Sequence, residues 1–427
     1  MADTLRNPKG TTDEYGEHAR LKRRIITTIT DAFETFGFEY LETPALEYTD
    51  TLTSKFSGGE EIIKEIFTLT DRGKRSLALR YDHTVPLARF IATHPEIAQP
   101  YKRYTVGQIF RDGPIKTGRR RVFTQADADI VGIRSVHAEL ELLELARHVF
   151  GELGIDARIV INHRALLEAL ICASGISIEH TETVMLSLDK LAKIGEDGVR
   201  ADLEDKGIPQ AATLMQAASA ARSMGPGELA SYSEHADLDE KTKERARSAL
   251  EDIEFLISHT QVEFDITLAR GLNYYSGVVF EAFAQDSTFT SSIAAGGRYE
   301  NILTAWTGKQ TAASGISFGV DAILASGSLE AGREQPRIFI IPIKRFDAAY
   351  ELARVLRNER IRCSVDVLER SITKNLRYAS SYDYAYALIV GDEEAESGTY
   401  TLRNLETGVE QKVSAPELIR MFTAQTM

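Results

Sequence analysis

A long interval without strand patterns interrupts a chain that is otherwise rich in them. From about Arg164 to Ser258, alanine, glutamate, leucine and serine recur at helical spacing, with turns at 207–209 and 224–227. Segments typical of strands come before this interval, and strand patterns resume at Val262–Leu268. If the strands before and after this interval belong to one sheet, the helical stretch between them is an insertion. The sequence therefore predicts an α+β domain with a helical insertion at about 164–258.

The segments before the insertion alternate between helical and strand patterns. Arg20–Phe36 predicts an amphipathic helix, because apolar residues recur at helical spacing and Gly37 ends the pattern. Glycine-rich stretches at Ala294–Tyr299 and Ser314–Val320 close a first domain, which we place at 1–325. The other predicted elements are an extended segment at Phe38–Leu46, strands at Leu77–Tyr81, Arg103–Phe110, Val122–Val131 and Ala157–Asn162, and a helix at about Ala138–Gly151.

A second, smaller domain is expected at 333–427, after a linker at Ser326–Gln335. Strand and helix patterns alternate here in the order βαβαβ, which predicts a small, mainly parallel α/β domain. The predicted strands are 337–343, 362–368 and 386–391, and the predicted helices are 347–359 and 372–381.

Composition limits the class of protein. The 427 residues are 43% hydrophobic and 26% charged, which is typical of an ordinary globular protein with two or three domains. No apolar run approaches the length of a transmembrane helix, and the polar N-terminus has no secretory signal. Cys172 and Cys363 are too few for a cysteine-rich zinc site, and we predict no protein metal site. Two reduced cysteines fit a cytoplasmic protein.

The charge distribution is uneven. The net charge of −13 argues against indiscriminate nucleic-acid binding. Between Arg337 and Arg377, however, ten lysines and arginines accompany only five acidic residues. This basic block is either a set of solvated helix faces or a surface that contacts phosphates.

A basic loop joins the strands within Tyr101–Gly132. Arg111 lies at the end of the first strand, and the loop adds Lys116, Arg119, Arg120 and Arg121. Such a loop between antiparallel strands could clamp a triphosphate and reach toward a nucleic-acid end. The alternative is an exposed hairpin with solvated charges.

The strand after the loop carries polar side chains on one face. Strict alternation puts Phe123, Gln125, Asp127 and Asp129 together. Because burying such groups without partners is costly, they either face water or bind a cationic or polar group. Upstream, the pair Asp82 and Thr84 precedes an apolar helical run.

The segment Leu268–Phe283 combines an arginine, two tyrosines and a carboxylate. Arg270, Tyr274, Tyr275 and Glu281 suit a pocket for an anion and a polar ring. The alternative is a core strand with an arginine at its mouth. Helix capping is the corresponding alternative for Asp82 and Thr84.

Several separated motifs, in the right order, resemble the histidyl-tRNA synthetases of class II. Phe36–Asp50, with Pro44, resembles motif 1, and Tyr101–Gly132 resembles motif 2. Arg270–Glu281, RGLNYYSGVVFE, resembles the histidine-specific signature RGLDYYTGTVFE, and AGGRYENIL at 295–303 matches the strand that follows it. The resemblance implies a catalytic domain with an antiparallel sheet, followed by an anticodon-binding domain.

The resemblance implies catalytic and ATP-binding residues. Arg111 would hold the ATP α-phosphate and the histidine carboxylate, and Arg270 would contact the α-phosphate from the other side. Arg121 would reach the ATP phosphates, and Phe123 would stack on adenine. The implied histidine contacts are Asp82, Thr84 and Gln125 to the α-amino group, Asp129 and Tyr275 to the imidazole, and Tyr274 along the pocket wall.

The resemblance also implies an activity and its partners. The chain is expected to be an ATP-dependent histidine–tRNA ligase that uses L-histidine, ATP with Mg²⁺, and tRNA(His). A homodimer formed through motif 1, and no membrane partner, complete the expectation.

Three positions depart from the family's pattern. Ala322 replaces the motif 3 arginine, Asn273 replaces the signature's aspartate, and Asp82 stands where glutamate is common. The missing arginine favours an alternative, a non-catalytic histidine-binding paralogue that resembles the regulatory subunit of ATP phosphoribosyltransferase. Arg270, the basic loop and the C-terminal domain argue against it. A nucleotide-binding interaction protein with an inactive site is a third interpretation.

Overall fold

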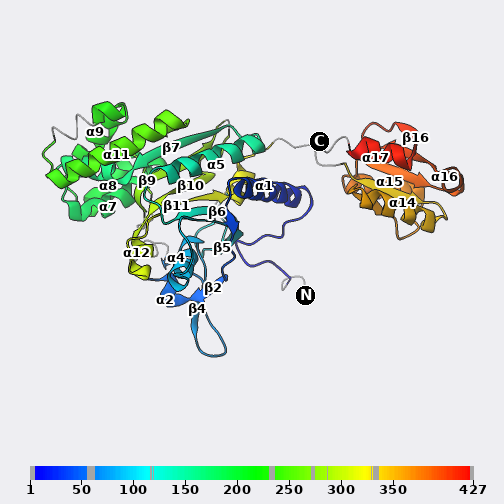
Figure 1. Ribbon diagram of the computed structural model, residues 1–427, viewed down its shortest axis with the longest axis horizontal. Coiled ribbons are helices and arrows are strands. Elements are labelled where there is room, and N and C mark those ends of the chain that lie inside the picture. The colour runs from blue at the N-terminus through cyan, green and yellow to red at the C-terminus, as the bar shows by residue number, and fades with distance from the viewer. Residues whose placement is uncertain are drawn as a thin grey trace. The chain divides into compact units, whose positions relative to one another are not determined.

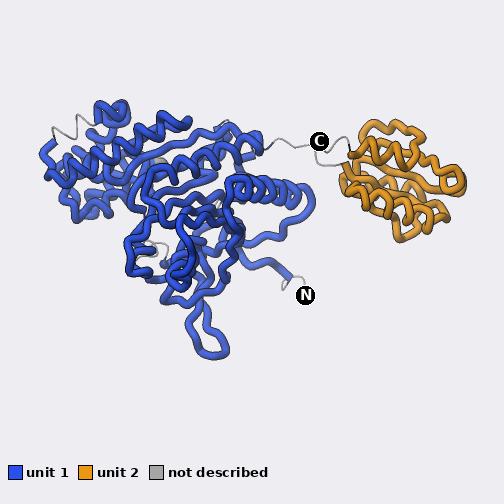
Figure 2. Tube along the Cα trace, viewed as in Figure 1, with its two compact units in different colours: residues 1–330 blue, residues 331–427 orange. Residues whose placement is uncertain are grey.

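The chain forms two compact units, at 1–330 and 331–427, which are described separately (Figure 2). The structure is a computed structural model that describes residues 5–54, 63–115, 118, 120–229, 236–270, 275–285, 287–327, 329 and 336–423. Within these ranges, every helix is too short or too polar to span a bilayer.

An eight-stranded, mostly antiparallel sheet forms the centre of the first unit (Figure 1). Only the two outer pairs, β1 with β5 and β7 with β8, are parallel. The predicted α+β domain with an antiparallel sheet is therefore confirmed. In spatial order the strands are β1 Glu39–Tyr40, β5 Tyr101–Phe110, β6 Val122–Val131, β11 Ala313–Gly319, β10 Ala294–Tyr299, β9 Tyr275–Ala284, β7 Ala157–His163 and β8 Glu263–Phe264.

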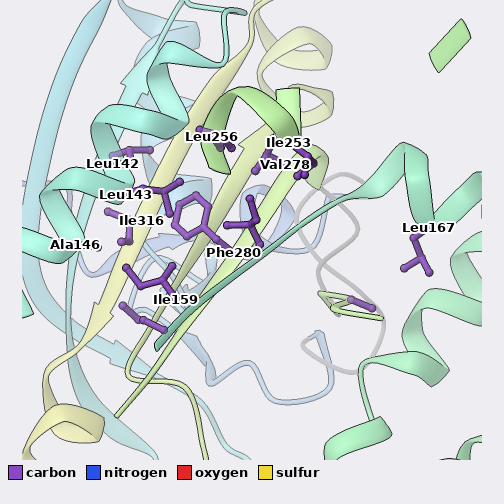
Figure 3. Packing of buried hydrophobic residues seen from close by; sticks show 14 of the residues in the cluster. Leu142, Leu143, Ala146, Ile159, Leu167, Ile253, Leu256, Val278, Phe280 and Ile316 are labelled. Atoms are coloured by element: carbon purple, nitrogen blue, oxygen red, sulfur yellow. The ribbon is translucent and has the colours of Figure 1, made fainter. Parts of the chain in front are cut away.

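Helices cover one face of this sheet and bury the main hydrophobic core. They include α1 Gly16–Thr35, α5 His137–Leu153, α11 Glu240–His259 and α13 Val320–Ser326. In Figure 3, Leu142 and Leu143 of α5 lie over the sheet residues Phe280 and Ile316, and Ile253 of α11 lies near Val278. Because side chains alternate along a strand, every second residue is left for the opposite face.

The helical insertion follows β7. Its described helices are α6 Arg164–Ala173, η2 Ile178–His180, α7 Thr181–Leu188, α8 Leu191–Asp205 and α9 Ala211–Ala221, before α11 leads back to the sheet. The Asp239 carboxylate caps α11 by accepting from the Thr242 amide. Gly195 breaks the helical geometry of α8 with a φ of 70°.

The predicted strand at Val262–Leu268 is wrong beyond its first residues. Only Glu263–Phe264 forms β8. Asp265 then accepts hydrogen bonds from the amide and hydroxyl of Thr267, which turns the chain. The Asn162 side chain in addition donates to two carbonyls of this turn, so polar contacts outweigh the strand pattern.

A smaller layer covers part of the opposite face. Its three-stranded sheet has the order β2 Leu46–Tyr48, β4 Ser76–Leu79 and β3 Thr68–Thr70, next to α2 Thr49–Leu52. The helices α4 Thr84–Thr93 and α12 Asn301–Thr307 contact each other. They form a second core cluster that contains Tyr275 and Tyr299 from the large sheet. The polar face of β6 lies beside this cluster.

The second unit is the small α/β domain that the βαβαβ pattern predicts. Strands β13, β12 and β14 are parallel, and β15 and β16 extend the sheet as an antiparallel hairpin. The spatial order is β13 Cys363–Val365, β12 Ile338–Pro342, β14 Tyr386–Val390, β15 Thr399–Asn404 and β16 Glu410–Ser414. Its helices are α14 Phe346–Asn358, α15 Ile372–Ser381, α16 Asp392–Ser397 and α17 Ala415–Thr423.

Candidate active site

A cavity of about 1710 Å³ lies along the polar face of the large sheet in the first unit. It brings together residues from the β4–α4 segment, the loop after β5, β6, β9 and the insertion, which are far apart in the sequence. The predicted site residues that line it are Asp82, Thr84, Arg111, Phe123, Gln125, Asp129, Arg270 and Tyr275.

Strand β6 supplies the floor of this cavity. Phe123, Gln125, Asp127 and Asp129 all line it, as strict alternation predicts. Ala126 and Ala128, which alternate with them, pack into the helix-covered core. One strand therefore presents an aromatic ring, an amide and two carboxylates in a row.

Asp129 is held by an ion pair and a phenol. Arg103 Nη2 lies 2.5 Å from Asp129 Oδ2, and the Tyr299 hydroxyl donates to Oδ1 at 2.5 Å. Arg103 is only 1% exposed and Asp129 only 3%. Burial raises the pKa of Asp129, whereas Arg103 and the Tyr299 hydroxyl lower it. Burial and the Asp129 charge raise the pKa of Tyr299, so the phenol remains a hydrogen-bond donor.

A glycine on the neighbouring strand makes room for this carboxylate. Gly315 of β11 is paired with Asp129 in the sheet register. A Cβ atom at position 315 would lie 2.1 Å from Asp129 Oδ1, closer than atoms can approach. The position of the Asp129 carboxylate therefore depends on the absence of a side chain at Gly315.

Asp127 is equally buried but has a different environment. Ser317 of β11 donates its hydroxyl to Asp127 Oδ1 at 2.6 Å. Among the described residues, no lysine or arginine nitrogen lies within 4 Å of the Asp127 carboxylate. Burial raises its pKa to about 7, although the charge of Arg103 opposes this shift. Asp127 was part of the predicted polar face but was not among the residues assigned to a ligand.

Asp82 both caps a helix and faces the cavity. Its Oδ1 accepts from the Val85 amide in the first turn of α4, at 3.0 Å. Its Oδ2 is buried and has no hydrogen-bond partner in the part of the chain that the structure describes. Burial raises the pKa of Asp82 to about 6. Capping and ligand binding are thus compatible at this residue, and Thr84 lines the cavity beside it.

Two arginines lie at the rim of the cavity, separated by the strands between β5 and β9. Arg111 Nε donates to the Tyr81 carbonyl at 3.1 Å, and its guanidinium lies 5.4 Å from the centre of the Phe123 ring. Arg270 forms an ion pair with Glu281. The two guanidiniums could hold an anion between them, above a floor that attracts cationic nitrogen groups.

Among the described residues, the basic loop contributes fewer side chains to the cavity lining than the sequence predicts. Arg121 does not line the cavity, and its Nη1 lies 2.8 Å from Asp112 Oδ1. Arg120 forms an ion pair with Glu14. Lys116 and Arg119 lie outside the described residues, as do Asn273 and Tyr274 of the signature segment.

Position 322 also lines the cavity. Ala322 lies there next to Asp321, whose carboxylate accepts from Lys22 Nζ at 3.1 Å and from the Thr124 amide at 2.7 Å. Lys64, which the sequence did not single out, adds a cation to the lining. Among the described residues, no group of three or more histidine, cysteine, aspartate or glutamate side chains is arranged to hold a metal ion.

The cavity continues between the sheet and the helical insertion. Both charge signs occur on this part of the lining, where the acidic residues are Glu182, Asp189, Glu196 and Asp265. The basic residues there are Arg158, Lys190, Lys193, Lys206 and Arg222. An elongated polyanion attached to a ligand at the floor would meet these cations.

Comparisons with known proteins agree over nearly the whole chain. A family model described as histidyl-tRNA synthetase matches residues 10–323, and one described as an anticodon binding domain matches residues 337–425. A curated relative named histidine–tRNA ligase 1, from Bacillus anthracis, is 39% identical over 420 residues. The match covers 97% of this chain and 99% of the relative.

Solved structures share the fold of both units. A histidyl-tRNA synthetase from Nostoc sp. PCC 7120 matches with a TM-score of 0.83 at 25% identity and covers 99% of each chain. A Bacillus halodurans protein described as an ATP phosphoribosyltransferase regulatory subunit/histidyl-tRNA synthetase has a TM-score of 0.72 at 22% identity. That match covers 91% of this chain and 98% of the other, and it shows similarity of fold.

Proposed function

Because the chain belongs to the histidyl-tRNA synthetase family, we propose that it activates histidine with ATP and transfers it to the 3′ end of tRNA(His). One observation carries the proposal: a single cavity combines a buried acidic floor with a guanidinium on each side of its rim. The floor suits the ammonium and imidazole groups of histidine. The rim suits the phosphate at which the reaction takes place.

In the activation step, the histidine carboxylate attacks the α-phosphorus of ATP, and pyrophosphate leaves with its Mg²⁺. Arg111 and Arg270 would hold the α-phosphate from opposite sides, where fixed positive charge stabilises the negative charge of the transition state. The Phe123 ring would stack on adenine. In the structure the Arg270 guanidinium is paired with Glu281, so the phosphate would share or replace this carboxylate as its partner.

Histidine would be selected by its imidazole. Asp129, oriented by Arg103 and Tyr299, would accept the imidazole N–H, and Tyr275 would bind the other side of the ring. A side chain without this donor would leave a buried carboxylate unpaired, which can discriminate by roughly 10⁴-fold. On the same proposal, Asp82, Thr84 and Gln125 hold the α-amino group, and Tyr274 completes the wall.

The tRNA would contact two regions. The cations on the insertion side of the cavity would contact the phosphates of the acceptor end. Residues 333–427 would form the anticodon-binding domain, with the basic block 337–377 as its phosphate-contact surface. Residues 1–325 would form the catalytic domain and dimerise through motif 1, and the reaction would take place in the cytoplasm. Arg121, which pairs with Asp112 and does not line the cavity in the structure, would have to turn toward it to reach the ATP phosphates.

A second candidate is a non-catalytic histidine sensor, favoured by alanine at position 322 and by the fold shared with the Bacillus halodurans protein. The match of residues 337–425 to an anticodon-binding model supports the ligase instead. The test is histidine-dependent exchange of pyrophosphate into ATP by the purified chain. We expect exchange. A folded protein that binds histidine without catalysing exchange would be the sensor.

A further inference from the structure

We propose that Asp127 binds the α-ammonium group of histidine together with Asp82, and so completes the amino-acid subsite. The inference rests on the proposed function, since it concerns the orientation of histidine in the same cavity. It adds a substrate-binding residue that the sequence motifs do not assign.

The position of Asp127 on β6 is the first reason. Residues on the same face of a strand are spaced by roughly 7 Å. An imidazole bound at Asp129 therefore leaves the backbone groups of histidine one step back along β6, above Asp127. Gln125, the next residue on this face, would lie beyond the amino group on the side of the phosphates. Asp127 is thus the floor residue nearest to the α-carbon.

The unmet hydrogen-bonding capacity of the two carboxylates is the second reason. An ammonium group has three N–H donors and needs an acceptor for each. Asp82 can offer only its buried Oδ2, because its Oδ1 is engaged by the Val85 amide. Among the described residues, the hydroxyl of Ser317 on β11 donates to Asp127 Oδ1, which leaves Oδ2 to accept from a ligand. The third donor would reach Thr84 or Gln125.

The charge balance of the floor is the third reason. The floor has three buried carboxylates, those of Asp82, Asp127 and Asp129. Among the described residues, Arg103 is the one cation that forms an ion pair with any of them, and its partner is Asp129. A buried carboxylate without a paired cation is costly. The charges that act on Asp127 are those of Arg80, Arg103 and Asp82 from other elements and that of Asp129 from β6 itself. An incoming ammonium group would supply the missing positive charge.

The competing explanation is that Asp127 only balances the buried arginines. It would then contribute to stability and contact no substrate. A comparison of two ligands separates the explanations, because imidazolepropionate has the ring and the carboxylate of histidine but lacks the α-amino group.

The experiment measures dissociation constants of histidine and imidazolepropionate by calorimetry, for the wild type and for Asp127→Asn. We expect the substitution to weaken histidine binding by roughly 10- to 100-fold, because a charged hydrogen bond is lost. Imidazolepropionate binding should change by less than about threefold. Equal weakening of both ligands would place Asp127 at the imidazole and overturn the proposal. An unchanged affinity for histidine would overturn it as well.

Matched variants complete the design. Asp129→Asn, at the next position on the same face, should weaken both ligands alike, because it alters the imidazole contact. If Asp127→Asn does not fold, Asp127→Ser takes its place. We expect this variant, too, to lose affinity for histidine but not for imidazolepropionate. Pyrophosphate exchange by the wild type distinguishes a failure of the proposed activity from a failure of the proposed role of Asp127. If the wild type catalyses no exchange, the proposed ligase activity is wrong. If the wild type catalyses exchange and the Asp127→Asn variant binds histidine normally, only the role of Asp127 is wrong.

Discussion

Two arginine–carboxylate pairs at the cavity, Arg103–Asp129 and Arg270–Glu281, differ in burial, and the difference separates recognition from chemistry. Arg103 and Asp129 are 1% and 3% exposed, and a phenol completes their contacts. The side chains of Arg270 and Glu281 are 20% and 15% exposed and lie at the rim. A buried pair cannot separate without leaving a charge uncompensated, whereas a rim pair can exchange partners. The first pair is suited to hold a fixed acceptor, and the second to release a guanidinium to a phosphate.

Breaking the floor pair should have the largest effect. Arg103→Met keeps much of the side-chain volume but leaves Asp129 buried without its cation. We expect a loss of roughly 3–5 kcal/mol in the free energy of unfolding, measured by urea denaturation at pH 8. Histidine affinity should fall with it. A variant as stable as the wild type would mean that the floor is more hydrated than its burial indicates.

Breaking the rim pair should affect rate more than stability. Arg270→Ala should reduce kcat for pyrophosphate exchange by roughly 10²- to 10³-fold, because a fixed cation at the α-phosphate is lost. The free energy of unfolding should fall by less than in Arg103→Met, because Arg270 and Glu281 are less deeply buried than Arg103 and Asp129. Glu281→Gln is the matched control, since it releases Arg270 without removing it. A mild rate effect of Arg270→Ala would mean that this residue does not contact the reacting phosphate.

The stability of the folded protein should depend on the ionisation of the cavity floor. Burial raises the pKa of Asp127 from 3.8 to about 7, so the folded protein holds this proton more tightly than the unfolded chain. The resulting stability is fully present below pH 3.8 and is lost as the pH rises through about 7. The charged floor is therefore least stable under the conditions in which it binds an ammonium group.

The Asp127→Asn variant should not lose stability as the pH rises through 7, because the amide does not ionise. Above pH 7 the variant should be more stable than the wild type, by on the order of 1–4 kcal/mol given the size of the shift. The difference should shrink as the pH falls toward 4. Urea denaturation between pH 5 and 8 measures it. A less stable variant at pH 8 would show that Arg103 depends on the Asp127 charge, so that the floor would contain a shared ion pair.

Much of the cavity could be predicted from the chain alone, because its signals are local. Alternation along β6 placed Phe123, Gln125, Asp127 and Asp129 on one face, and the structure agrees. Arg103 gave no such signal, although it is the largest fully buried side chain among the residues that the structure describes. Its role follows from the β5–β6 register, which pairs it with Asp129. Nothing in a single strand reveals the residue opposite.

Apolar residues that recur every two or every 3.6 positions, together with the order of the motifs, identified the layers, the insertion and the family. Each of these signals depends on residues that are close in sequence. Tertiary structure alone decided which charges meet. The Tyr299 hydroxyl reaches Asp129 across 170 positions, and Lys22 reaches Asp321 across 299. Burial is likewise collective: it raises the pKa values of Asp82 and Asp127 only because several elements exclude water together.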